Sequence, residues 1–306
     1  MSEENLVYLK GELQPASQAH IAIYDAAVVL GATVTDLART FRGELYRLED
    51  HVRRFYRSCR YARIEPRIEP EETMAFCREL VAHNRSLADT GAELAVVLFI
   101  SPGEFAVYAG AAGMAGEQEP TFCIHTFPLP FSLWAPYFSE GVHVVTPSVR
   151  QVPPVCVDPK IKCRSRMHWW LADQETHLVD PQAVSLCLDL DGNITETSGA
   201  NFLIAREGTI YSPSPRSILR GISLETVAEL CRALQIPFVE RDLQVSDVLN
   251  ADEAYLATTP YCLAPVTKIN GLPIGAGVPG PLFARLIAAW SERVGVDIVG
   301  QVRGEG

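Results

Sequence analysis

The first part of the chain has a pattern of apolar residues that predicts a small sheet covered by helices. Hydrophobic and polar residues alternate through Val34–Arg39, and Leu94–Ile100 is wholly apolar, so both segments are expected to be β-strands. A third strand is expected at Thr121–Phe127. Apolar positions recur every three or four residues in 51–64, which predicts a helix, and Glu71–Asn84 is expected to form a second one. This pattern indicates an α/β lobe.

The rest of the chain mixes short strands with helices. The expected strands include Val142–Val145, Ala183–Asp189, Asn201–Ala205 and Glu253–Thr258, and the expected helices are Met167–His177, Ser223–Leu234 and Pro281–Val294. Because strands and helices do not alternate strictly, the predicted class is α+β. We expect a smaller N-terminal lobe at 1–127 and a larger C-terminal lobe at 137–306. The segment 128–136, PLPFSLWAP, contains three prolines and is expected to link them.

Composition narrows the possible functions. The chain has 306 residues, of which 48% are hydrophobic and 21% charged, which suits two folded lobes rather than a disordered chain. Its net charge of −11 argues against a nucleic-acid binder. The N-terminal segment shows no signal-peptide pattern, and no apolar run is long enough to span a membrane. Eight cysteines without a CxxC pair or zinc-type spacing predict reduced thiols, no metal site and a cytoplasmic protein.

One common motif occurs in a setting that does not suit it. Gly275–Gly280 fits the pattern G-x-G-x-x-G and precedes a helix. A dinucleotide site also needs a βαβ unit, and the motif lies too close to the end of the chain to begin one. We therefore do not expect a dinucleotide site there.

Four separated parts of the sequence carry groups that are suited to cofactor chemistry. They are Val157–Lys162, Gly192–Phe202, Leu219–Thr226, and a pair of distant pieces formed by Thr258-Thr259 and His51–Arg54. A lysine amine can act as a nucleophile toward an aldehyde and later as a base. The third segment is a glycine-containing turn before an amphipathic helix, with Ser223 expected as the N-cap, and exposed N–H groups at a helix start bind phosphate.

In their order and rough spacing these segments resemble the class IV (fold-type IV) aminotransferases, which include the branched-chain and D-amino-acid enzymes. The resemblance covers nearly the whole chain. It implies a homodimeric enzyme that binds pyridoxal 5′-phosphate and transfers an amino group from an amino acid or amine to a 2-oxo acid. Two other readings stay open: a lyase of the aminodeoxychorismate lyase type on the same cofactor site, and a binding protein that has lost turnover.

The resemblance also implies roles for single residues. Val157–Lys162 resembles the family strand that ends in the lysine that forms the aldimine with the cofactor. Lys162 takes the place of that lysine, with Lys160 as the alternative two positions earlier on the same strand. Glu196 matches the glutamate that keeps the pyridine nitrogen protonated, while Asn201 is expected to satisfy backbone groups. The residues implied in binding the rest of the cofactor, chiefly its phosphate, are Arg54, Leu219, Ile222, Ser223 and Thr259.

The expected substrate contacts lie where the chain departs from its relatives. Thr35-Asp36 replaces the usual aromatic-Glu pair, and alternation places Thr35 and Arg39 on one face of the strand. No basic residue lies between Val96 and Gly116, which disfavours the D-amino-acid subgroup. Since Pro260 lacks an N–H group, Arg39 is expected to bind the substrate carboxylate, with Thr35 and Thr258 as further substrate contacts.

Overall fold

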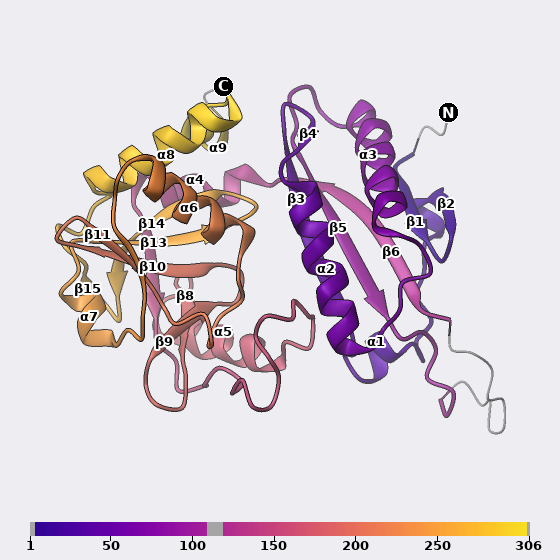
Figure 1. The fold of residues 1–306 in the computed structure, drawn as a ribbon, viewed down its shortest axis with the longest axis horizontal. Helices are drawn as coiled ribbons and strands as arrows, with labels where there is room; N and C mark the ends of the chain where they lie inside the picture. Colours follow the sequence, from indigo (N-terminus) through magenta and orange to yellow (C-terminus); the bar gives the residue numbers. More distant parts are fainter. Residues whose placement is uncertain (1–3, 109–118, 305–306) are drawn as a thin grey trace. The chain divides into compact units, whose positions relative to one another are not determined.

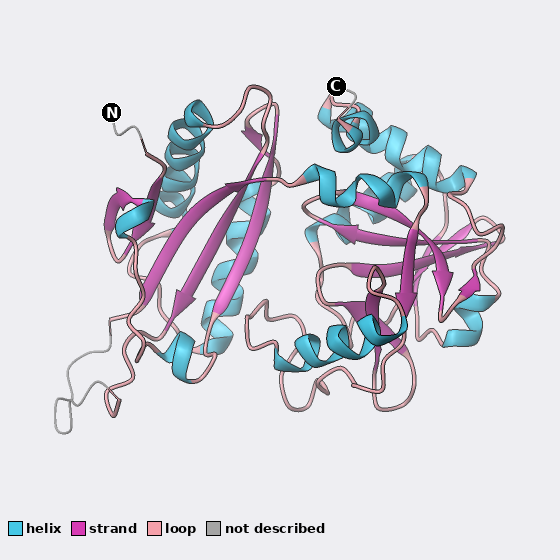
Figure 2. Ribbon diagram, turned by 180° about the vertical axis from the view of Figure 1, so that it is seen from behind, coloured by secondary structure: helices cyan, strands magenta, loops and turns pink. Residues whose placement is uncertain are grey.

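The computed structural model describes residues 4–108 and 119–304, so part of the stretch between Val96 and Gly116 that lacks basic residues lies outside the described residues. The chain forms two compact units, which are described separately (Figures 1 and 2). The first comprises Met1–Leu129 and Ile161–Arg166, and the second comprises Pro130–Lys160 and Met167–Gly306. The segment 128–136, expected as a linker, contains the end of β6 and the start of a helix, α4.

The first unit is a six-stranded sheet with the order β2-β1-β6-β5-β3-β4. Its strands are β1 (Leu6–Leu9), β2 (Glu12–Pro15), β3 (Val34–Phe41), β4 (Glu44–Leu45), β5 (Leu94–Ser101) and β6 (Thr121–Pro128). All its pairings are antiparallel. The helical elements are the 3₁₀-helix η1 (Ala16–Gln18) and the α-helices α1 (Ala26–Val29), α2 (Leu48–Ala62) and α3 (Pro70–Leu87).

Helices α2 and α3 cover one face of this sheet (Figure 1), and the view from behind shows the opposite face of its strands (Figure 2). Val52 and Phe55 of α2 and Leu80 of α3 pack with Leu98 and Ile124 of the sheet in one buried core. Fully burying an apolar side chain of this size contributes about 1.5–3 kcal/mol. The face of each strand that carries Leu98 and Ile124 is therefore fixed against the helices, and alternate residues lie on the other face.

The second unit is built on a nine-stranded sheet with the path β12-β11-β10-β13-β14-β7-β8-β9. The strands are β7 (Val142–Val145), β8 (Val184–Leu188), β9 (Ile194–Thr197), β10 (Asn201–Arg206), β11 (Thr209–Ser212), β12 (Phe238–Glu240), β13 (Glu253–Thr258), β14 (Cys262–Ile269) and β15 (Leu272–Pro273). Glu196 of β9 pairs with Asn201 of β10, so six of these strands close into a ring. Parallel and antiparallel pairs occur together, and the predicted α+β class is confirmed.

The helices of the second unit are α4 (Phe131–Ser139), α5 (Met167–Val179), α6 (Ile222–Ala233), α7 (Val245–Leu249), α8 (Pro281–Val294) and α9 (Ile298–Arg303). The bounds of α8 agree with the prediction because Pro281 occupies its first turn and Gly295 ends it with a positive φ of 67°. Within the described part of the chain, no helix combines the length and hydrophobicity needed to cross a bilayer.

Candidate active site

Lys162 lies in a short extended segment of the first unit that pairs with the start of β3. The Lys162 N–H donates to Ser58 Oγ at 3.4 Å, and its carbonyl accepts from the Thr35 N–H at 2.9 Å. The next residue, Cys163, pairs with Val34 of β3. The backbone of Lys162 is therefore held by the sheet and by α2.

The segment Val157–Lys162 is not the strand that the sequence predicted. Pro159, which has no N–H to donate to a neighbouring strand, forms a turn with Lys160. Lys160 Nζ lies 3.5 Å from Asp158 Oδ1 in a partly exposed ion pair. The two candidate lysines thus differ in environment, since Lys160 is paired at the surface and the backbone of Lys162 joins the sheet edge.

Arg54 belongs to a buried cluster of charged and polar side chains in the first unit. Its Nε and one terminal nitrogen donate to the two carboxylate oxygens of Asp36, each at 2.8 Å. His51 Nδ1 lies 2.8 Å from Asp36 Oδ1 and donates to it. Asp36 is 0% exposed, His51 1% and Arg54 5%. Arg54 is therefore a fixed cation, unlike its neighbour Arg53, which faces solvent and pairs with Glu49.

Opposing effects set the pKa values in this cluster. Burial alone would raise the pKa of Asp36, but the Arg54 charge and the hydrogen bonds from Arg54 and His51 outweigh it and hold that pKa well below its usual range. Burial lowers the pKa of His51, and the charges of Arg54 and Lys162 act in the same direction, while Asp36 opposes them. The cluster therefore contains an ionised carboxylate, an arginine cation and a histidine that resists protonation.

Arg39 and Thr35 of β3, which were expected to contact substrate, make contacts with other residues of the first unit. Arg39 is 1% exposed, its Nε donates to Thr40 O at 3.0 Å, and its Cζ lies 3.9 Å from the centroid of the Phe41 ring. Thr35 Oγ1 donates to Leu98 O at 2.8 Å. These surroundings favour a packing role for Arg39 over the carboxylate contact expected from the sequence.

Donor groups of the second unit surround Glu196. Asn201 Nδ2 donates to one oxygen at 3.0 Å, the Leu219 N–H lies 3.2 Å from both oxygens, and Gln151 Nε2 lies 3.5 Å from one. Asn201 Nδ2 also donates to Leu219 O at 2.8 Å. Several donors around a carboxylate fix its orientation.

Helix α6 begins at Ile222, three residues after Leu219, and its start differs from the prediction. Gly221, with φ −68° and ψ 139°, is the N-cap, and Ser223 is the second residue of the helix rather than its cap. Extended backbone at Gly221 begins the helix earlier than the Ser223 hydroxyl suggested. A Cβ added to Gly221 would lie 2.1 Å from Asn201 Oδ1, so the turn approaches Asn201 closely only because this residue is glycine.

No side chain in the described part of the chain caps α6. The first N–H groups of a helix lack partners within the helix, and the positive end of the helix dipole lies beside them. The N–H groups of Ile222 and Ser223 at this 12-residue helix therefore suit an anion.

The turn that contains the predicted threonines joins β13 to β14. Thr258 Oγ1 donates to Gly199 O at 2.6 Å, which ties the end of β13 to the loop after β9. Thr259 and Pro260 form the turn itself. The contacts of Glu196 with Leu219 just before α6, and of Thr258 with the loop after β9, thus bring the predicted residues of the second unit together.

Sequence reasoning did not identify several residues of these clusters. Gln151 is 7% exposed, and its Oε1 lies 3.0 Å from His168 Nε2. Asn201, expected to serve only backbone groups, also holds Glu196. The alternation of β3 contained a signal for Asp36, because it places Asp36 on the face opposite Thr35, toward α2.

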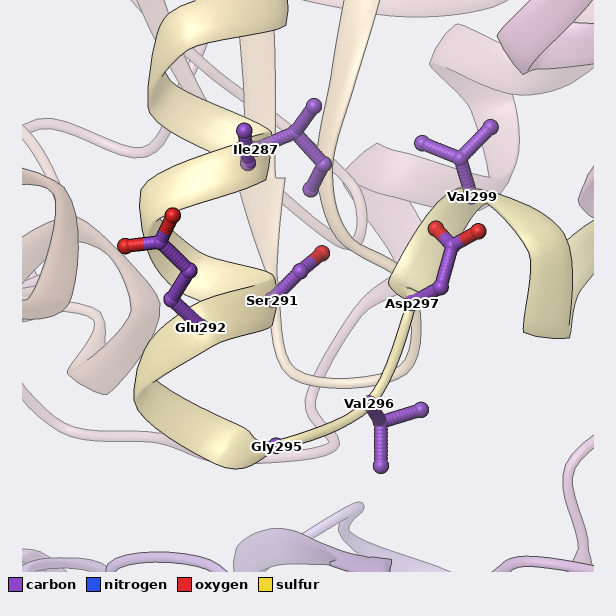
Figure 3. A pocket seen from close by; sticks show the side chains of 8 residues that line it. Ile287, Ser291, Glu292, Gly295, Val296, Asp297 and Val299 are labelled. Carbon is purple, nitrogen blue, oxygen red and sulfur yellow. The ribbon is translucent and has the colours of Figure 1, made fainter.

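The second unit also has a pocket that is separate from the predicted site residues. It opens between α8 and α9 and is lined by Ile287, Ala288, Ser291, Glu292, Gly295, Val296, Asp297 and Val299 (Figure 3). Ser291 Oγ accepts from the Ile298 N–H at 3.1 Å, and Asp297 caps α9 by accepting from the Gly300 N–H. None of the predicted site residues lines this pocket, and Ser291 and Asp297 serve the turn between the helices.

The model of the amino-transferase class IV family matches residues 33–269, which is more than half of the chain. The chain belongs to the class IV aminotransferase family. It is 27% identical to D-alanine aminotransferase of Bacillus licheniformis over 94% of this chain and 96% of the relative. It is also 27% identical to a putative branched-chain-amino-acid aminotransferase of Methanocaldococcus jannaschii, over 92% of this chain and 93% of that one.

Solved structures of branched-chain aminotransferases share the fold of this class IV enzyme. The branched-chain amino acid aminotransferase of Escherichia coli has a TM-score of 0.86 at 22% identity, with 94% of each chain covered. The T.th. branched-chain amino acid aminotransferase with pyridoxamine 5′-phosphate has a TM-score of 0.83 at 24% identity, covering 95% of this chain and 94% of that one. These likenesses confirm fold type IV.

Proposed function

We propose that this class IV aminotransferase is a pyridoxal-phosphate-dependent transaminase that moves an amino group between an amino acid or amine and a 2-oxo acid. Aminotransferase names among its relatives favour transamination over the lyase reaction. The observation that carries the proposal is the fixed carboxylate of Glu196, bonded to the Leu219 N–H just before the uncapped start of α6. This pairing suits a ligand that carries both a basic ring nitrogen and a phosphate.

The predicted residues supply a proposed partner for each group of pyridoxal phosphate. The Lys162 amine would hold the cofactor covalently, and the carboxylate of Glu196 would accept a hydrogen bond from the ring nitrogen. Its phosphate would be bound by the N–H groups of Ile222 and Ser223, the Thr259 hydroxyl and the Arg54 guanidinium, which Asp36 already orients.

Each side chain then has a defined task. When bound, the cofactor accepts the electron pair released at the substrate α-carbon. Glu196, oriented by its donors, holds the proton on the ring nitrogen. The Lys162 amine takes the proton from the α-carbon and returns it. Arg54 binds and orients, because it is already paired with Asp36 and has no proton to give.

Borohydride reduction of the purified protein tests this proposal. We expect an absorbance band in the visible range that reduction abolishes, and peptide mapping should then find the reduced cofactor on Lys162. Lys160→Ala is the matched control and should label normally, whereas Lys162→Ala should not label. Conversion of the bound cofactor to its pyridoxamine form by a panel of amino donors tests turnover. Label on Lys160, or no conversion by any donor, would contradict the proposal.

We further propose that the enzyme is a homodimer. The outer side of α5 exposes Met167 (70%), Trp170 (61%), Leu171 (50%) and Leu178 (88%), which follow helical spacing along one stripe. Exposed apolar stripes of this kind support a protein interface. We expect light scattering to give twice the chain mass and Trp170→Glu to lower it; a monomeric wild type would refute the dimer.

We also propose a cytoplasmic location. All eight cysteines are free thiols in the structure, and five are buried, which suits a reducing compartment. Cell fractionation tests this proposal, and recovery of the enzyme from an oxidising compartment would refute it.

A further inference from the structure

Arg164 lies two residues after Lys162 and points to the same side of the first unit. Cys163, between them, pairs with Val34, whose side chain is buried in the core under α2 and α3. Successive side chains of extended backbone point to opposite faces, so Lys162 and Arg164 both lie on the face away from these helices. Their Cα atoms are about 7 Å apart along such a segment.

The backbone at Arg164 is fixed, and its guanidinium rests on an aromatic ring. The Arg164 N–H donates to Thr33 Oγ1 at 2.9 Å, and Cζ lies 5.0 Å from the centroid of the Phe99 ring. Phe99 alternates with Leu98 and Ile100, which face the core, so its ring also lies on the opposite face. A planar guanidinium set on a ring keeps the N–H groups at its edge available to an anion.

The charge around Arg164 is not balanced within the described residues. The side chain is exposed, and among residues 4–108 and 119–304 its guanidinium donates no hydrogen bond and forms no ion pair. Arg166 is a like-charged neighbour. Burial lowers the pKa of the nearby His125, and the Arg164 charge lowers it further. An exposed cation beside another cation is a site that an anion would stabilise.

Arg54 and Arg39 of the first unit are less accessible to a substrate than Arg164, since both are buried. Arg54 uses two nitrogens on Asp36, and Arg39 is buried against Phe41. We propose that Arg164 binds a carboxylate of the substrate, on the same face as Lys162. The inference rests on the proposed function and names the group that recognises acidic substrates.

Matched substrate pairs test the role of Arg164. An amino acid is compared with the amine that lacks its α-carboxylate, and a dicarboxylic 2-oxo acid with the monocarboxylic acid of the same length. Arg164→Gln should lower kcat/KM by about ten- to a hundredfold for the carboxylate that it binds, as expected for loss of a charge-assisted contact. The partner without that carboxylate should change by less than about threefold. The pair that responds identifies which carboxylate is bound.

Two further variants separate the planar guanidinium from its charge. Arg164→Lys keeps the charge but loses the fork of donors, so its kcat/KM should fall between those of wild type and Arg164→Gln. Arg166→Gln removes the neighbouring charge and should change kcat/KM by less than about threefold, which makes it the matched control.

Equilibrium binding gives a readout that does not depend on turnover. Calorimetry should show that Arg164→Gln weakens binding of glutarate or butyrate to the cofactor-loaded protein about tenfold or more. Equal losses for both members of each substrate pair, together with weaker cofactor retention, would make Arg164 a phosphate anchor and overturn the inference. Unchanged kinetics and binding would also overturn it. A wild type that converts no donor would refute the proposed function instead, and the calorimetry would still decide the role of Arg164.

Discussion

Replacing Asp36 by Asn tests whether its ion pair with Arg54 holds α2 on the sheet of the first unit. The side chain of Asp36 is 0% exposed and that of Arg54 is 6% exposed, so water has little access to replace the lost charge. Removing one partner of a buried pair costs about 3–5 kcal/mol because the other charge stays buried without compensation. Asn keeps the shape of Asp and one acceptor oxygen, so we expect about 3 kcal/mol, at the low end of this range.

Hydrogen exchange measures this loss where it occurs. The chain has two units, so a single melting temperature would not report on the first one alone. A loss of about 3 kcal/mol should speed exchange of the protected α2 amides by about a hundredfold, while amides of α8 in the second unit should not change. Asp50→Asn is the matched control: Asp50 accepts from Arg47 Nε at 2.7 Å but is 29% exposed, so its loss should cost under about 1 kcal/mol.

A double-mutant cycle shows whether the effect belongs to the pair. Arg54→Met leaves Asp36 as the unpaired buried charge, so it should also destabilise the first unit. The combined variant, Asp36→Asn with Arg54→Met, should lose less than the sum of the two single losses, because it contains no unpaired charge. Additive losses, or α2 exchange that Asp36→Asn does not change, would refute the reasoning.

Two further predictions concern Glu196 and His51. Glu196→Gln should retain cofactor, since the phosphate-binding groups are untouched, but lose about a hundredfold or more in turnover; near-normal turnover would assign the ring nitrogen another partner. Because the pKa of the folded His51 is lowered, mainly by burial, the unfolded chain takes up a proton below about pH 6.5 before the folded one does. The first unit should therefore lose stability as the pH falls from 7.5 to 5.5, measured by α2 exchange corrected for intrinsic rates, and His51→Gln should remove most of this loss. Asp36 does not contribute in that window, since its lowered pKa stabilises the fold at any pH above about 3.9. An equal slope in His51→Gln would contradict this assignment.

Local signals in the sequence predicted the elements that depend on local chemistry. The apolar run of β5 is buried at every position, and α8 begins at Pro281 and ends before Gly295 as predicted. The failures involve partners that are distant in sequence. The expected strand before Lys162 is a turn, and the chain around Lys162 is extended only because it finds the edge of β3, more than a hundred residues earlier. Ser223 looked like a cap, but the contact between Gly221 and Asn201 sets where α6 begins.

The same limit explains why the sequence analysis predicted Arg39 as the carboxylate partner and did not consider Arg164. Alternation gives the face on which a side chain lies, but it does not tell how deeply the side chain is buried. Arg39 lies on the expected face, yet its long side chain turns back onto Phe41 and the Thr40 carbonyl, which a strand pattern cannot show. Arg164 follows Lys162 in a segment whose partner strand was not predictable, so its position above Phe99 appears only once that segment is paired with β3. Arg39 and Arg164 carry the same charge but differ in how well they can bind a carboxylate. A guanidinium that is already buried and hydrogen-bonded is stabilised less by a new anion than one that is exposed beside another cation.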